Sequence, residues 1–215
     1  MMLQYGILAR DLRKIDESQL PAILVRQTTI LVNFLHFRVL ITHEDVLILH
    51  VFKQTQGETS HISAFMYELQ GKLQQVNRHH GNLPYELRAL ETILIMVMSE
   101  LDIEFQDLQK PVRQVIQELD HDVSLEKLKK LADVSRQLNA FQQKVKLVRE
   151  ALRTVLDADD DMAAMYLTEK ALGKPRAEAD HEEVELLLEN YYECSGEIME
   201  KAETLLSDVQ ITHDR

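Results

Sequence analysis

Apolar and small residues recur at alternating steps of four and three along three long stretches of the chain. In the first stretch these positions are Leu94, Met98, Leu101, Phe105, Leu108, Val112, Val115 and Leu119. In the second they are Leu131, Val134, Leu138, Phe141, Val145, Val148, Leu152 and Val155. In the third they are Val184, Leu188, Tyr191, Ser195, Ile198, Ala202, Leu205 and Val209. This spacing puts one apolar face along a helix, so the sequence predicts three long packed helices.

Breaks between these stretches indicate how the helices are joined. Ser124 follows the first stretch and is a good N-cap for the second, and two equal stretches joined by a tight turn predict an antiparallel hairpin. Pro111 lies inside the first helix, where it should cause a kink at a cost of about 3 kcal/mol. A short helix is expected from Met162 to Leu167, and a polar linker over residues 173–181 leads into the last helix.

The N-terminal part has a different sequence pattern, in which short runs rich in Ile, Val, Leu, Thr and Phe follow one another. The predicted strands are Ala22 to Val25, Thr28 to Leu35, Phe37 to Thr42 and Val46 to Phe52, with a turn at Thr42 to Asp45. Their apolar runs are nearly continuous, so the sheet should be covered on at least one face. A helix over about Ser60 to Asn77 is the expected cover.

These elements predict an α+β fold. It consists of a small mixed β-sheet layer covered by a helix, a long antiparallel helical hairpin and a C-terminal helix. The break at residues 79–82 suggests an α/β subdomain over residues 1–81 and a helical subdomain over residues 82–215.

The net charge of the chain limits which classes of molecule can be its main binding partner. The chain has 36 acidic and 24 basic residues and a net charge of −12, which argues against nucleic acid or an anionic membrane surface as the main partner. The last helix is especially acidic and carries a single local base, Lys201. Its glutamates are Glu182, Glu183, Glu185, Glu189, Glu193, Glu197, Glu200 and Glu203. These acids therefore need water, a cation or a basic partner beside them.

Candidate chemistry is sparse. Asp157, Asp159, Asp160 and Asp161 form an acidic run suited to Mg²⁺, which takes oxygen ligands and needs only one or two carboxylates. The competing interpretation is that these acids cap the short helix from Met162. The single Cys194 excludes an internal disulfide and a thiolate zinc cluster. There is no phosphate-binding loop and no nucleophile motif, so an enzyme is not expected. No apolar run approaches the roughly 18 to 20 residues of a membrane-spanning helix.

Five short stretches occurring in order carry a family resemblance. They are Arg10-Asp11-Leu12-Arg13-Lys14-Ile15-Asp16, Ile30-Leu31-Val32-Asn33-Phe34-Leu35-His36, Asn82-Leu83-Pro84-Tyr85-Glu86-Leu87-Arg88-Ala89-Leu90-Glu91, Asp159-Asp160-Asp161-Met162-Ala163-Ala164-Met165-Tyr166-Leu167-Thr168 and Leu186-Leu187-Leu188-Glu189-Asn190-Tyr191-Tyr192. Together they closely resemble the mitochondrial inner-membrane branch of the CorA-type magnesium channels, over nearly the whole chain.

The resemblance implies a matrix-facing domain of a precursor with a transit peptide. Five subunits surround the channel, and the last helix is the stalk that runs into the pore. The family's Gly-Met-Asn motif and two membrane helices are absent from this sequence, and its first strands before Arg10 are expected to be missing. The membrane is thus a partner only through a C-terminal segment beyond the sequence given.

The resemblance also implies regulatory Mg²⁺ sites at subunit boundaries. The matching acids are Asp16 or Asp11 from the α/β layer and Glu189 from a neighbour's stalk helix, with the Asp157 to Asp161 run as a second candidate. In the third stretch Leu83, Leu87 and Leu90 should be core. There, Glu86 is interpreted as forming surface pairs with Arg88 or Glu91, worth under about 1 kcal/mol.

These observations lead to one main hypothesis and one alternative. The main hypothesis is a regulatory, magnesium-sensing domain that controls assembly and gating of Mg²⁺ influx. Its partners would be Mg²⁺, as both regulatory and transported ion, further copies of the chain in a pentamer, and a paralogous subunit. The alternative is a scaffold without transport, in which acidic antiparallel helices bind a partner helix. The heptads alone would support that alternative.

Overall fold

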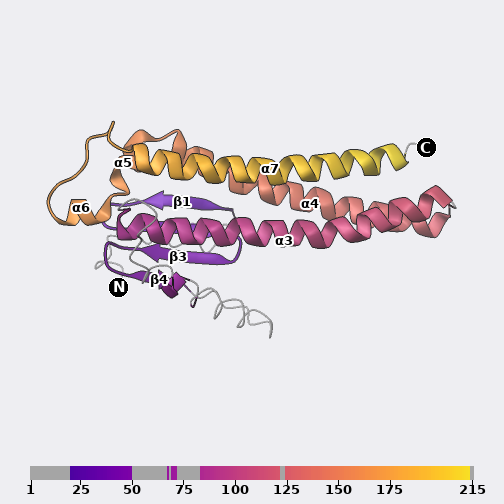
Figure 1. The fold of residues 1–215 in the computed structure, drawn as a ribbon, viewed down its shortest axis with the longest axis horizontal. Helices are drawn as coiled ribbons and strands as arrows, with labels where there is room; N and C mark the ends of the chain where they lie inside the picture. Colours follow the sequence, from indigo (N-terminus) through magenta and orange to yellow (C-terminus); the bar gives the residue numbers. More distant parts are fainter. Residues whose placement is uncertain (1–19, 50–66, 68, 72–82, 122–123, 214–215) are drawn as a thin grey trace. The chain divides into compact units, whose positions relative to one another are not determined.

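The computed structural model of the 215-residue chain describes residues 20–49, 67, 69–71, 83–121 and 124–213 (Figure 1). The stretch from Arg10 to Asp16 lies outside these residues. So does nearly all of the helix expected over Ser60 to Asn77, of which residue 67 and residues 69–71 are described and are helical.

All four predicted strands are present. They are β1 (Ala22–Val25), β2 (Ile30–Phe34), β3 (Phe37–Ile41) and β4 (Val46–Ile48), and they lie in the order β1-β2-β3-β4. Each pairing is antiparallel, so the expectation of a mixed sheet is wrong for the described strands. The reason is that each connection is a short hairpin, whereas a parallel pair needs a long crossover.

Two turns set the register of this sheet. Phe34 pairs with Phe37, so Leu35 and His36 alone form the turn between β2 and β3, and Leu35 takes a φ of 53°. At the predicted turn between β3 and β4, the Thr42 hydroxyl oxygen accepts the backbone N–H of Asp45 at 2.8 Å. All five residues of β2 are buried, which confirms that the sheet is covered.

The three long helices are confirmed as α3 (Tyr85–His121), α4 (Leu125–Leu156) and α7 (Glu182–His213). All eight heptad positions of α7 are buried, including the small residues Ser195 and Ala202 at 0% exposure. The α3 helix continues through Pro111. At the start of α4, the Ser124 hydroxyl accepts the backbone N–H of Lys127 at 3.4 Å, as expected of an N-cap. In place of the single short helix from Met162, the chain forms α5 (Asp159–Ala164) and α6 (Leu167–Ala171).

The chain divides into two compact units, and α3, α4 and α7 each pass through both. Unit 1 combines Met1–Val97 with Ala151–Tyr191, and unit 2 combines Met98–Glu150 with Tyr192–Arg215. The predicted boundary between residues 81 and 82 lies outside the described residues and stays a prediction.

Contacts within unit 2 show how its helices run. Lys144 on α4 donates to Glu104 on α3 at 2.6 Å, while Lys127, near the start of α4, reaches the backbone carbonyl of Glu118 at 3.0 Å. Later residues of α4 thus meet earlier residues of α3, which confirms the antiparallel hairpin. On α7, Lys201 lies 3.9 Å from Asp102 of α3.

Candidate functional site

Glu189 is the one described member of the predicted pair of Mg²⁺ ligands between subunits. It is exposed on α7, and within the described part of the chain its carboxylate forms no ion pair or hydrogen bond. Asp11 and Asp16 lie outside the described residues, so their approach to Glu189 stays a prediction.

The aspartate run does not cap a helix as interpreted from the sequence. Ala158 is the N-cap of α5 and makes no side-chain cap bond, while Asp159, Asp160 and Asp161 form the first helical turn. They still lie at the positive end of the helix dipole. Asp157 precedes α5 and pairs with Arg153 at 3.6 Å. Among the described residues, no three His, Cys, Asp or Glu side chains lie close enough to share a metal ion.

Asp161 has a perturbed pKa. Burial raises the pKa of this carboxyl most, the neighbouring Asp160 raises it further, and Arg26 opposes both. The raised pKa means that the folded chain holds the charged form of Asp161 at a cost.

Replacing Asp161 with asparagine is therefore expected to stabilise the protein at neutral pH. When the pKa of an acid is higher in the folded state than in the unfolded state, its ionisation lowers the free energy of unfolding of the protein. This loss develops as pH rises through the unfolded value, here near 3.8, toward the folded value. The gain should vanish below that range, and thermal unfolding followed by circular dichroism at about pH 3 and about pH 7 measures it. Asp157→Asn, at an exposed and paired position, is the control and should give no gain. A lower melting temperature for Asp161→Asn at neutral pH would contradict the assignment.

Arg176 is the centre of a cluster of polar contacts that the sequence pattern did not indicate. Its guanidinium lies 3.6 Å from the ring centroid of Tyr166 and binds Glu169 through two hydrogen bonds of 2.9 and 2.7 Å. It also donates to Glu183 on α7 at 3.2 Å. The hydrogen bonds from Arg176 hold the pKa of Glu169 below its usual value. Burial raises the pKa of Tyr166 to about 12, with Arg176 opposing the shift, so the phenol stays neutral.

Glu86 does not form the surface pairs that were expected from the sequence. It is fully buried, and its carboxylate accepts both the backbone N–H of Thr168 at 2.8 Å and the Thr168 hydroxyl at 2.5 Å. The expected surface pairs with Arg88 or Glu91 are wrong, because Glu86 falls on the same helical face as buried Leu90 and Ile93. That spacing was the available signal in the sequence. The bond joins the first turn of α3 to the first turn of α6.

A third polar contact lies at the start of α7. The Nδ1 of His181 donates to the backbone carbonyl of Glu178 at 2.6 Å. Its Nε2 lies 3.7 Å from Glu185 and 3.9 Å from Asp159. His181, Arg176 and Glu86 thus each fix part of the segment from α5 to the first turns of α7. This segment immediately precedes Glu189.

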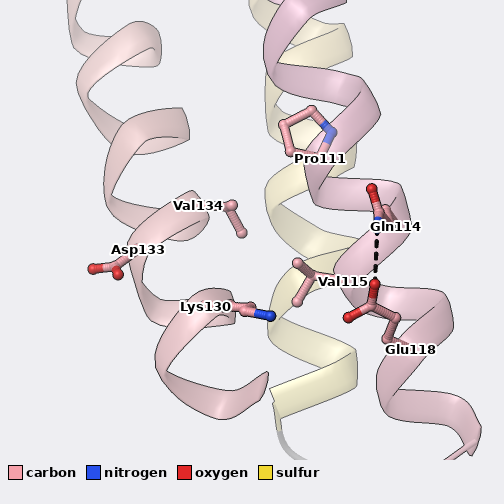
Figure 2. Close-up of a pocket in the computed structure, with 7 residues that line it drawn as sticks. All are labelled: Pro111, Gln114, Val115, Glu118, Lys130, Asp133 and Val134. Carbon is pink, nitrogen blue, oxygen red and sulfur yellow. Dashed lines mark hydrogen bonds between the residues drawn. The ribbon is translucent and has the colours of Figure 1, made fainter. Parts of the chain in front are cut away.

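A shallow depression lies between α3 and α4 in unit 2. It has a volume of about 280 Å³ and is lined by Pro111, Gln114, Val115, Glu118, Lys130, Asp133 and Val134 (Figure 2). Its polar groups are engaged locally: Gln114 bonds Glu118, and Asp133, which points away from the hollow in Figure 2, pairs with Arg136. A membrane-spanning length of apolar helix is not found among the described residues.

Comparisons with known proteins place this geometry in context. A family model described as magnesium transporter MRS2-like matches residues 1–215. The mitochondrial inner membrane magnesium transporter mrs2 of Aspergillus fumigatus is 46% identical over 215 residues, covering 100% of this chain and 36% of the relative. The corresponding transporter LPE10 of Yarrowia lipolytica is 44% identical, covering 100% of this chain and 47% of the relative.

The fold also matches a solved structure. The CorA magnesium transporter of Methanocaldococcus jannaschii aligns with a TM-score of 0.63 at 13% identity, over 99% of this chain and 63% of that chain. At this identity the likeness shows a shared fold. The chain spans between about a third and a half of the two fungal relatives.

Proposed function

The chain belongs to the MRS2-like family of magnesium transporters, and we propose that it is the regulatory, Mg²⁺-sensing region of such a transporter. The names of its relatives support a location at the mitochondrial inner membrane. In this proposal the region faces the matrix. In this proposal the ion that is transported is also the ion that is sensed.

The observation that carries the proposal is the state of Glu189. Acids just before it are engaged: Glu183 binds Arg176, and Glu185 lies beside His181. Glu189 is exposed and has no such partner among the described residues. A hard cation that keeps several waters, such as Mg²⁺, needs only one or two carboxylates of this kind.

Assembly supplies the second carboxylate. Asp16 or Asp11 of one copy would face Glu189 of its neighbour, in a pentamer of this chain or with a paralogous subunit. Without a metal these carboxylates repel one another, and bound Mg²⁺ neutralises them, favouring the closed arrangement. Loss of Mg²⁺ lets the subunits separate and the pore open. Asp157, Asp159, Asp160 and Asp161 are a second place where Mg²⁺ binds weakly.

Replacing Glu189 and Asp16 together with alanine is expected to weaken Mg²⁺ binding at least about tenfold, because both carboxylate ligands are lost. Isothermal titration calorimetry with MgCl₂ measures the affinity, and light scattering measures the mass with and without millimolar Mg²⁺. The charge-matched control is Glu126→Ala with Asp133→Ala on α4, two exposed acids paired within their own helix. That control should bind Mg²⁺ as the unmodified chain does.

Two results would count against the proposal in different ways. Unchanged affinity in the Glu189 and Asp16 variant would show that other residues hold the ion. No Mg²⁺ heat and no change in mass in the unmodified chain would remove the sensing role and favour the scaffold.

A further inference from the structure

Arg149 is a half-buried cation on the face of α4 that meets α7 within unit 2. Its Cζ lies 4.3 Å from the ring centroid of Tyr192, which holds the guanidinium by a cation–π contact. Gly196, one turn further along α7, leaves room for it: a Cβ there would lie 3.3 Å from Nη2 and 3.5 Å from Cζ. The guanidinium therefore lies against an aromatic ring and beside a residue that has no side chain.

No acid satisfies this cation within the described part of the chain. The Nε of Arg149 is buried without a hydrogen-bond partner, so the terminal nitrogens are its accessible donors. Two other bases of unit 2 have acidic neighbours, since Lys144 pairs with Glu104 and Lys201 lies near Asp102. An unpaired guanidinium is unexpected in a chain of net charge −12, where acids outnumber bases.

Lys146 extends the positive charge along the same helical face. It precedes Arg149 by three residues, a spacing that makes side chains neighbours on a helix. Lys146 is exposed and, among the described residues, has no ion pair. Gln142, four residues before Lys146, donates to Glu203 of α7 at 3.3 Å. A neutral amide thus contacts this carboxylate of α7, and among the described residues no ion pair joins Arg149 or Lys146 to an acid.

We propose that Arg149 and Lys146 form an oxyanion-binding subsite between α4 and α7, separate from the Mg²⁺ sites. A planar guanidinium matches the two oxygens of a carboxylate or phosphate, and a nearby ammonium adds a flexible second charge. Tyr192 and Gly196 orient the guanidinium before the ligand arrives, which reduces the entropy lost on binding. The ligand is an oxyanion, supplied either as free phosphate or as a carboxylate of a second copy of this chain.

The first arm of the test titrates the full chain with inorganic phosphate in calorimetry. Saturable binding is expected. Arg149→Lys keeps the charge but loses the planar pair of guanidinium donors, and it should weaken binding about tenfold or more, as should Lys146→Gln. Lys129→Gln is the matched control, because it removes an exposed base of the same helix away from the subsite, and it should bind phosphate normally. Gly196→Ala should weaken binding without changing the charge, because it displaces the guanidinium.

The second arm measures self-association by sedimentation velocity at low salt. If a carboxylate of another copy is the ligand, the chain self-associates, phosphate disperses the complexes, and the Arg149 and Lys146 variants stay monomeric. Phosphate binding of equal strength in all variants would overturn the subsite. So would the absence of both phosphate binding and variant-sensitive self-association. Circular dichroism melts establish that each variant is folded, and the exposed Lys146→Gln change decides the outcome if Arg149→Lys unfolds.

Discussion

Replacing Glu86 with alanine is expected to lower the free energy of unfolding by about 3 kcal/mol. The change removes a fully buried carboxylate and leaves the backbone N–H and hydroxyl of Thr168 without their acceptor. Hydrogen bonds to a charged group contribute about 1.5–3 kcal/mol, and a buried donor left unpaired costs its desolvation besides. For a chain of this length the melting temperature should fall by about 6–12 °C. Urea and thermal unfolding followed by circular dichroism measure both quantities.

The control and the partner variant test whether the effect belongs to this bond. Glu91→Ala removes a half-buried acid of the same helix that has no hydrogen bond or ion pair among the described residues, and it should cost well under half as much. Thr168→Val keeps the shape of the side chain but removes the hydroxyl. A double-mutant cycle between residues 86 and 168 should then give a coupling of about 1–2 kcal/mol. A loss for Glu86→Ala equal to that for Glu91→Ala would contradict the role of the bond.

The helical part of the fold could be predicted because its determinants are local and repetitive. The four-three spacing in α7 marks eight positions, and all eight are buried. Ser124 and the turn at Thr42 were likewise recognisable, since a capping hydroxyl or a short polar turn acts within three residues. The antiparallel order of the hairpin followed from the short turn that joins two helices of similar length.

The polar contacts between elements could not be predicted in the same way. Glu86 and Thr168 are 82 residues apart, and their bond depends on where the first turns of α3 and α6 lie in the folded chain. Periodicity could show that Glu86 faces the core. It could not identify Thr168, whose hydrogen bonds offset the free-energy cost of burying the carboxylate. The sequence also favoured capping of a helix from Met162 by the aspartates, whereas α5 begins three residues earlier, at Asp159, and its N-cap is Ala158.

The candidate Mg²⁺ site rests on a different kind of inference. Glu189 was singled out through the family resemblance, and the structure adds that it is exposed while Glu183 and Glu185 have partners. A site shared between subunits needs carboxylates from two copies, so no periodicity within a single chain could reveal it. Within unit 1, Arg176 and His181 contact Glu183 and Glu185 in the first turns of α7.

Replacing Arg176 with methionine is expected to destabilise the protein by about 2–3 kcal/mol. Methionine retains much of the apolar stem of arginine but loses the double hydrogen bond to Glu169 and the contact with Tyr166. It also leaves Glu169, Asp180 and Glu183 close together without their shared cation. Calorimetric and urea unfolding at neutral pH and low salt measure the loss.

The pH dependence of stability distinguishes the ion pair between Arg176 and Glu169 from simple packing. Because Arg176 lowers the pKa of Glu169 below its ordinary 4.5, the pairing stabilises the folded chain above that pH. Its contribution is lost as pH falls through the lowered value. The difference between the unmodified chain and Arg176→Met should therefore shrink on acidification, and the pKa of Glu169, followed by NMR, should rise in the variant. Arg176→Lys keeps the charge without the planar fork and should lie between the two. If the methionine variant keeps the lowered pKa of Glu169, Arg176 is not its cause.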